Sequence, residues 1–140
     1  MKIWDEHSEH VERITPDKER ARSIIKVVEL REKDLIGKVE EFSTLIVESY
    51  YEIIKELITA VMYCDGWKTL SHELLIGYLS KFYKEISSAE IYTIDQLRKT
   101  RNDINYRGFI VKPEYLKRSR ENILEIIKKL KGILDKKVKI

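Results

Sequence analysis

The chain has 140 residues, of which 43% are hydrophobic and 36% charged, with only five glycines and two prolines. This composition indicates a folded helical domain with a single core and argues against a disordered or β-rich chain. The net charge is only +3, but residues 96–140 carry 14 lysines and arginines against 5 acidic residues, which favours either a polyanionic partner or a solvated lysine-rich helix.

The first predicted helix follows a helix-start signal. Thr15 is expected as the N-cap and Pro16 as the first helical residue, where its missing N–H costs nothing. The apolar face of this helix consists of Ala21, Ile24, Ile25, Val28 and Leu35. Gly37 and Ser43-Thr44 mark the connection to the next helix.

The second predicted helix runs from Thr44 to about Cys64 and is densely apolar. Its polar residues form one narrow stripe, which consists of Glu48, Glu52, Lys55, Glu56 and Thr59. So wide an apolar arc fits a central helix with several neighbours, or one that also contacts a second subunit. We expect a two-fold homodimer, because closed two-fold pairing is the commonest way to bury leftover apolar surface.

Three further helices complete the chain. Ser71 caps a short third helix, Ser87-Ser88 introduces a fourth that stops at Gly108, and the last runs from Pro113 to about Asp135. No strand-like alternation competes with this pattern, so the fold class is all-α with five helices. We expect one helical domain at residues 15–135, an N-terminal tail at 1–14 and a basic C-terminal tail at 136–140.

The sequence favours a cytoplasmic location. No apolar run is long enough to cross a bilayer, and the first residues lack a signal-peptide core, so no membrane partner is expected. Cys64 is the single cysteine, which excludes an intrachain disulfide. Abundant lysine, glutamate and isoleucine with a single glutamine are typical of thermophilic proteins.

Metal and cofactor sites are not expected. His7 and His10 have a spacing that could share a metal ion, but no third fixed ligand accompanies them. Ser71-His72-Glu73 resembles a catalytic triad in its letters only, because adjacent helical residues point in different directions. No glycine-rich phosphate loop, paired-cysteine site or nucleophile elbow is present. We therefore predict no metal ion and no cofactor.

The segment from Arg101 to Gly108, near the end of the fourth helix, is the most informative part of the chain. On a helical wheel, Arg101 and Asn105 fall inside an apolar arc that consists of Ile91, Ile94, Leu97 and Ile104. A guanidinium on such a face needs partners, because an unpaired buried charge costs several kcal/mol, about the cost of its desolvation. Arg101 is therefore expected to hold a polar network, to face a cleft that receives an anion, or to extend to the rim.

This segment and the order of the helices resemble the HEPN domain, the higher-eukaryote and prokaryote nucleotide-binding family. The resemblance covers residues 15–135 and includes the Ser71-His72 entry to the third helix and the Asn-x-x-x-Tyr-Arg-Gly ending of the fourth. It implies an up-and-down bundle and a homodimer whose arginine motifs face a shared cleft. It also implies one of three roles: a metal-independent RNase in a toxin–antitoxin or defence system, a nucleotide-binding module, or a companion of a small nucleotidyltransferase.

The family's catalytic pattern is an arginine, a polar residue and, a few positions later, a histidine. Arg101 and Asn102 match its first two members, whereas Tyr106 occupies the histidine position. A phenol with a pKa of about 10 is a poor base at pH 7. Tyr106 can still stack on a base, and Arg101 can still clamp a phosphate. His72 could serve as the base only if the fold brings it next to Arg101.

Three functions remain open at this point. The first is a homodimeric module that binds RNA, a nucleotide or a partner protein with little or no catalysis; its expected binding residues are Arg98, Arg101, Asn102, Asn105, Tyr106 and Arg107. The second is an active metal-independent RNase with Arg101 and Tyr106 as catalytic residues, or with Asn102 or His72 in place of the missing histidine. The third is a helical protein-interaction domain in which Arg101 is purely structural.

Overall fold

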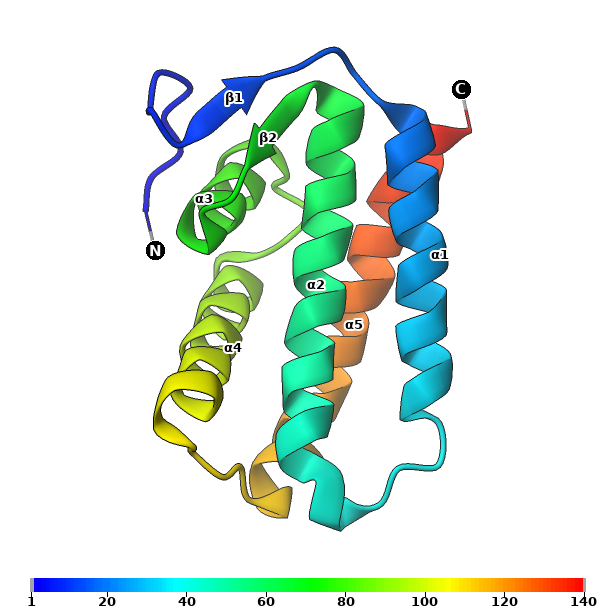
Figure 1. Ribbon diagram of the computed structural model, residues 1–140, viewed down its shortest axis with the longest axis vertical. Helices are drawn as coiled ribbons and strands as arrows, with labels where there is room; N and C mark the ends of the chain where they lie inside the picture. The colour runs from blue at the N-terminus through cyan, green and yellow to red at the C-terminus, as the bar shows by residue number, and fades with distance from the viewer. Residues whose placement is uncertain (1, 140) are drawn as a thin grey trace.

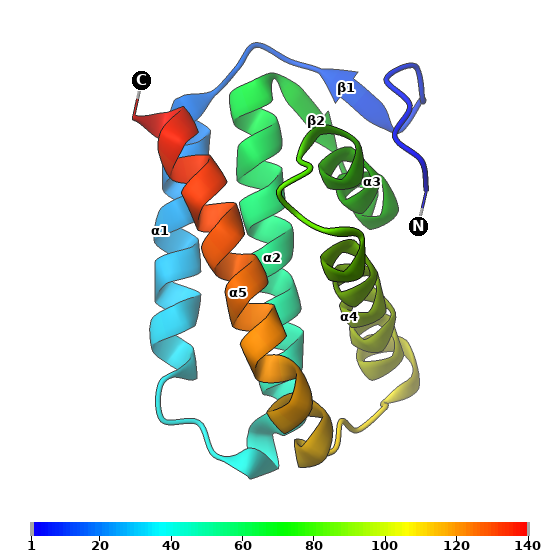
Figure 2. The same cartoon turned by 180° about the vertical axis from the view of Figure 1, so that it is seen from behind.

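The apolar helix predicted near the middle of the sequence is the central element of the computed structural model, which describes residues 2–139 (Figure 1). Four other helices surround it, and the five helices are α1 (Lys18–Leu35), α2 (Ser43–Asp65), α3 (His72–Phe82), α4 (Ser88–Arg107) and α5 (Pro113–Val138). α2 contacts all of the others, and α5 lies behind it in the view of Figure 1 and in front of it in the reverse view of Figure 2. The predicted all-α fold with five helices is therefore confirmed. Within residues 2–139, no helix is both long and apolar enough to cross a membrane.

The helix ends follow the local chemistry of their caps. Ser71 caps α3 and Ser87 caps α4, where helix starts were predicted, and Ser87 also forms a capping box with Glu90. α2 and α4 end at Gly66 and Gly108, whose φ angles of 88° and 65° lie in the left-handed region that favours glycine. The start of α1 was predicted wrongly. Its N-cap is Asp17, whose carboxylate accepts a hydrogen bond from the Arg20 backbone N–H at 2.9 Å.

The N-terminal segment, expected as a tail, is an integral part of the fold. Its strand β1 (Val11–Arg13) pairs antiparallel with β2 (Trp67–Thr69), although no strand was predicted. The Trp4 side chain is only 4% exposed and packs edge-on against the rings of Trp67 and Tyr78. The segment lies so close to α3 that a Cβ atom at Gly77 would be 2.2 Å from the Lys2 carbonyl oxygen. Strands of three residues are too short to produce a readable alternation in the sequence.

The expected C-terminal tail is also mostly helical, since α5 continues to Val138. The Lys137 ammonium donates a hydrogen bond to the Asp65 carboxylate at 2.7 Å, and the hydroxyls of Tyr78 and Tyr83 donate to the same carboxylate. Burial and the bond to Asp65 raise the pKa of Tyr83 to about 12. This network joins the ends of α2, α3 and α5.

At the opposite end of the bundle, the turn between α4 and α5 is attached to the first turn of α2. The Val111 backbone N–H donates to Thr44 Oγ1 at 2.9 Å. Lys117 of α5 forms an ion pair of 2.8 Å with Glu40 in the short 3₁₀ helix η1 (Glu40–Phe42). These contacts hold the end of α4, which carries the Arg101 segment, in a defined position relative to α2.

Candidate functional site

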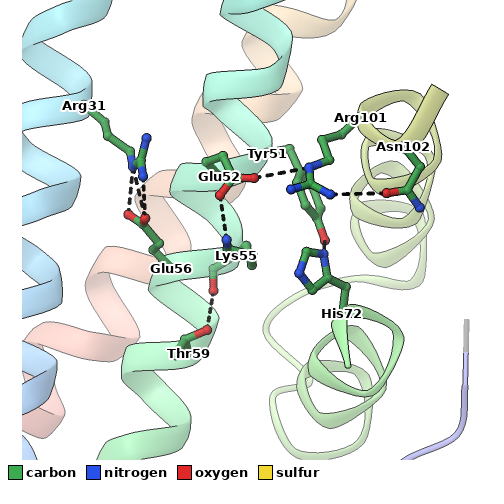
Figure 3. Close-up of polar contacts among 9 residues, drawn as sticks. All are labelled: Arg31, Tyr51, Glu52, Lys55, Glu56, Thr59, His72, Arg101 and Asn102. Carbon is green, nitrogen blue, oxygen red and sulfur yellow. Dashed lines mark hydrogen bonds and ion pairs between the residues drawn. The ribbon is translucent and has the colours of Figure 1, made fainter. Parts of the chain in front are cut away.

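The polar stripe of α2 lies between α1 and α4, and an arginine from each of these helices reaches it (Figure 3). From α1, Arg31 binds Glu56 with contacts of 2.8 to 3.0 Å. From α4, Arg101 lies 3.3 Å from Glu52. The polar stripe of α2 therefore provides an acidic partner for Arg101, the arginine that lies on the apolar face of its helix.

Arg101 joins α4 to α2 through several polar groups. The turns before it bury Ile91, Ile94 and Leu97, but the Arg101 side chain is 22% exposed at the edge of this face. Its Nη1 donates to the Asn102 side chain at 3.4 Å. With the Asn105 amide turned so that its oxygen faces Arg101, Nε donates to that oxygen at 3.1 Å. The Asn105 amide nitrogen donates in turn to Glu48 at 2.6 Å.

One part of the Arg101 guanidinium remains available. Nη2 makes no hydrogen bond to residues 2–139, whereas every buried side-chain nitrogen and oxygen in this part of the chain has a partner. Nη2 is therefore open to solvent. Two N–H donors of a fixed guanidinium that face solvent are suited to a phosphate or carboxylate oxygen.

Glu52 is shared between two cations. It accepts a hydrogen bond from Lys55 at 2.6 Å and faces Arg101 on its other side. Burial acts to raise the pKa of Glu52, but the bond from Lys55 and the charges of Lys55, Arg101 and Arg31 outweigh burial and lower the pKa. Glu52 is therefore ionised at neutral pH and competes with any anionic ligand for Arg101.

His72, the first residue of α3, lies in the same region (Figure 3). Its Nδ1 is 3.0 Å from the hydroxyl of Tyr51, a residue of α2 that is 1% exposed. Burial lowers the pKa of His72, and the charges of Lys55 and Arg101 lower it further. Burial also raises the pKa of Tyr51 far above its usual range. At pH 7 the pair is therefore a neutral imidazole held by a neutral phenol, within the electrostatic field of Arg101.

A cavity of about 250 Å³ adjoins this pair between α1, α2 and β2. Its walls include the side chains of His72, Lys55, Glu56, Thr59 and Lys68. The ammonium groups of Lys55 and Lys68 can donate hydrogen bonds to an anion, and His72 can exchange a proton with it. The cavity therefore gives a small polar ligand access to His72 and Lys55.

The structure separates the residues predicted for the site into two groups. Arg101, Asn102 and Asn105 share one network, and Arg98 lies nearby, 11% exposed and paired with Asp95 at 3.0 Å. The positive charge of Arg98 acts to lower the pKa values of both Tyr51 and His72. Tyr106 and the Arg107 side chain are instead 80% and 81% exposed in the last turn of α4. Neither makes a hydrogen bond to Arg101 in the described chain.

Several residues of the site were missed in the sequence. Tyr51 and Glu52 provide partners for His72 and Arg101, and Glu48 and Lys55 complete the network. Three of the four belong to the polar stripe of α2 or flank it, and this stripe on an otherwise apolar helix was the available signal. Tyr51 gave no signal, since a tyrosine in an apolar helix reads as a packing residue.

The histidines near the N-terminus do not form a metal site. His7 and His10 are exposed, and each lies 3.4 to 3.5 Å from the glutamate that precedes it. Nowhere within residues 2–139 do three histidine, cysteine, aspartate or glutamate side chains gather in a way that could hold a metal ion.

Comparison with known proteins gives no relative. No family model matches the chain, and neither a curated protein nor a solved structure matches it. The likeness to HEPN domains therefore rests on the Arg101 segment and on the order of the helices.

Proposed function

We propose that this protein is a HEPN-like module that binds RNA at the Arg101 site as a two-fold homodimer, with weak or no catalytic turnover. A toxin–antitoxin or nucleotidyltransferase system is the setting that the resemblance suggests. The free Nη2 of Arg101 carries the proposal, because a fixed arginine with open donors can hold a phosphate. The absence of a histidine at the Tyr106 position supports binding over catalysis.

The charges around Arg101 support an anionic ligand only in part. Lys55 and Arg98 lie close to it, but Glu52 and Asp95 balance these two charges, and the nearby His72 is neutral at pH 7. A phosphate would therefore approach the open side of Arg101 and share the guanidinium with Glu52. The binding energy would come from a few charge-assisted hydrogen bonds rather than from a strongly positive surface.

The support for a dimer comes from α1 rather than from α2. The apolar arc of α2 is covered by the helices of its own chain and does not by itself need a second subunit. However, Val27 and Leu30 of α1 are 42% and 64% exposed, and Leu45 at the start of α2 is 55% exposed. Val27 lines the same hollow as Thr59 of the stripe, so a second copy that covers these residues would lie beside the site.

The proposal is tested by RNA binding. A short fluorescein-labelled single-stranded RNA is titrated with the protein in EDTA, and fluorescence anisotropy measures the Kd. Arg101→Ala should weaken binding by about 2 kcal/mol or more, since it removes a desolvated charge contact. Arg101→Lys should restore it only in part, because lysine cannot form two parallel hydrogen bonds.

The dimer is tested separately. Light scattering should give twice the 16.7 kDa mass of the chain.

Arg31→Ala is the matched control, because Arg31 also pairs with a glutamate of α2 but reaches it from α1, on the side of α2 away from α4. RNA binding that survives Arg101→Ala, or that falls equally in both variants, would contradict the proposed site. In that case Arg101 would be a structural arginine of a helical interaction domain. A monomer in light scattering would contradict the dimer.

A second candidate, metal-independent RNA cleavage, is favoured by the Tyr51–His72 pair. A neutral His72 can take the proton of a 2′-hydroxyl, so that the 2′-oxygen attacks phosphorus and a 2′,3′-cyclic phosphate forms. The P–O5′ bond breaks, and the 5′-oxygen leaves with a proton from Lys55, which lines the same cavity. Cleavage in EDTA that is lost on His72→Ala but retained in Tyr106→Phe would establish this candidate.

A further inference from the structure

A second cavity, of about 310 Å³, lies at the turn between α4 and α5. Its walls include the side chains of Phe109, Ile110, Tyr115, Lys112 and Arg118. No residue of the α2 stripe lines it, so the cavity is separate from the Arg101 site.

Backbone contacts define the shape of this cavity. The Phe109 N–H donates to the Asp103 carbonyl at 3.1 Å, and the Val111 N–H donates to Thr44 Oγ1 at 2.9 Å. The Tyr115 N–H donates to the Lys112 carbonyl at 3.1 Å. The turn is thus held by α4, α2 and α5, and the cavity exists before any ligand binds, which lowers the entropic cost of binding.

The side chains around the cavity combine exposed apolar surface with positive charge. Phe109 is 50% and Ile110 72% exposed. Lys112 and Arg118 are exposed, and neither forms an ion pair with residues 2–139, whereas Glu114 is the acidic residue of the walls. Aromatic rings next to unpaired cations are typical of sites that bind single-stranded nucleic acid, because bases stack on the rings while cations contact the phosphates.

We propose that this cavity holds one base of a single-stranded RNA. The base stacks on Phe109 or Tyr115, and Lys112 and Arg118 contact the phosphates on either side. The volume lies at the lower limit of ligand sites, which is about 300 Å³, and so suits a single planar ring system. The inference deepens the proposed function, since it requires that the protein binds RNA, but it does not require that Arg101 makes the contact.

The test compares substitutions of one exposed ring. Phe109→Leu keeps an apolar side chain but removes the aromatic face, and it should weaken binding of a labelled oligouridylate by about five- to a hundredfold. Phe109→Trp should retain or improve binding. Tyr92→Ala is the matched control, because Tyr92 is a 66% exposed aromatic residue near the other end of α4, and it should bind like the wild type. Arg118→Ala should reduce the slope of log K against log salt by about one.

The same titrations separate this inference from the proposed function. Loss of binding in Phe109→Leu with normal binding in Arg101→Ala would support the cavity and overturn the Arg101 site, and the reverse result would do the opposite. Equal binding by wild type and Phe109→Leu, with unchanged melting, would overturn the inference. So would a change of oligomeric state in Phe109→Leu without a change in RNA affinity, since the cavity would then accept a protein chain. No RNA binding by the wild type would overturn both proposals.

Discussion

Two arginines approach α2 from opposite sides, and they are satisfied to different degrees. Arg31 of α1 binds both carboxylate oxygens of Glu56, and the hydrogen bond to Glu56 raises the pKa of Arg31. Arg101 of α4 makes one contact of 3.3 Å to Glu52, whose carboxylate is shared with Lys55, and keeps Nη2 free. The first arrangement is a bidentate ion pair, and the second is an incomplete pair with a single contact.

This difference shows how similar residue pairs can have different roles. In the Arg31–Glu56 pair, one edge of the guanidinium binds both carboxylate oxygens, so that the glutamate has little left for another cation. Around Arg101, the partners fix the side chain without using all of its donors. Preorganised donors of this kind are what a binding or catalytic site needs, because the cost of ordering them is met during folding.

The largest effect is expected from a histidine at position 106, in the last turn of the helix that carries the incomplete pair. If the chain is a HEPN scaffold that lacks its base, Tyr106→His should raise RNA cleavage in EDTA by about 10²- to 10⁴-fold, the scale of general acid–base catalysis. The gain should disappear in Tyr106→His with Arg101→Ala, because the phosphate is no longer positioned. A gel assay on labelled RNA measures both. If Tyr106→His leaves cleavage unchanged with the fold intact, the exposed position of residue 106 is unsuitable for catalysis.

The next largest effect is the contribution of the two arginine–glutamate pairs to the free energy of unfolding. A double-mutant cycle measured by urea unfolding should give a coupling of about 1 kcal/mol for Arg31 and Glu56, since their geometry is bidentate but partly exposed. The coupling of Arg101 and Glu52 should be about half as large, because Lys55 continues to neutralise Glu52 when Arg101 is removed. A larger coupling for Arg101 and Glu52 would mean that Arg101 is mainly structural.

Removal of the competing carboxylate should have a smaller effect on ligand binding. Glu52→Gln keeps the size of the side chain but removes the negative charge that a phosphate would meet. We expect RNA affinity to rise by about three- to tenfold, in line with the energy of a partly exposed charge pair. Glu56→Gln is the control and should leave affinity unchanged. Anisotropy titrations measure both, and unchanged affinity in Glu52→Gln would indicate that no phosphate reaches Arg101.

The smallest effect is the pH dependence that His72 contributes. Because the pKa of His72 is lowered in the folded state, the unfolded chain takes up the proton first as the pH falls below about 6.5. This histidine therefore stabilises the fold above that pH, and the stabilisation decreases as the pH falls towards the pKa of the folded state. Melting curves from pH 7.5 to 5 should show a smaller decrease of Tm in His72→Gln than in the wild type. Parallel curves would show that His72 titrates like an exposed histidine.

Much of the secondary structure could be predicted because its signals are local. The cap at Ser71, the helix start at Ser87 and the stop at Gly108 act within one turn of the chain, and all three were recognised. Pairing of β1 with β2 and burial of Trp4 depend on residues more than 50 positions away, and so the N-terminal segment was expected as a tail. The first helix was misplaced because Asp17 and Thr15 are both good caps, and only the fold selects between them.

The sequence alone determined the five helices, the apolar centre of α2 and the unusual position of Arg101 on α4, because each is a property of spacing along one helix. Only the tertiary structure decided what Arg101 meets. It placed Glu52 against the guanidinium, brought His72 to Tyr51, and left Tyr106 in solvent. The reason is geometric: the packing of α3 and α4 against α2 sets which side chains approach one another, and helical periodicity within each segment carries no record of that packing.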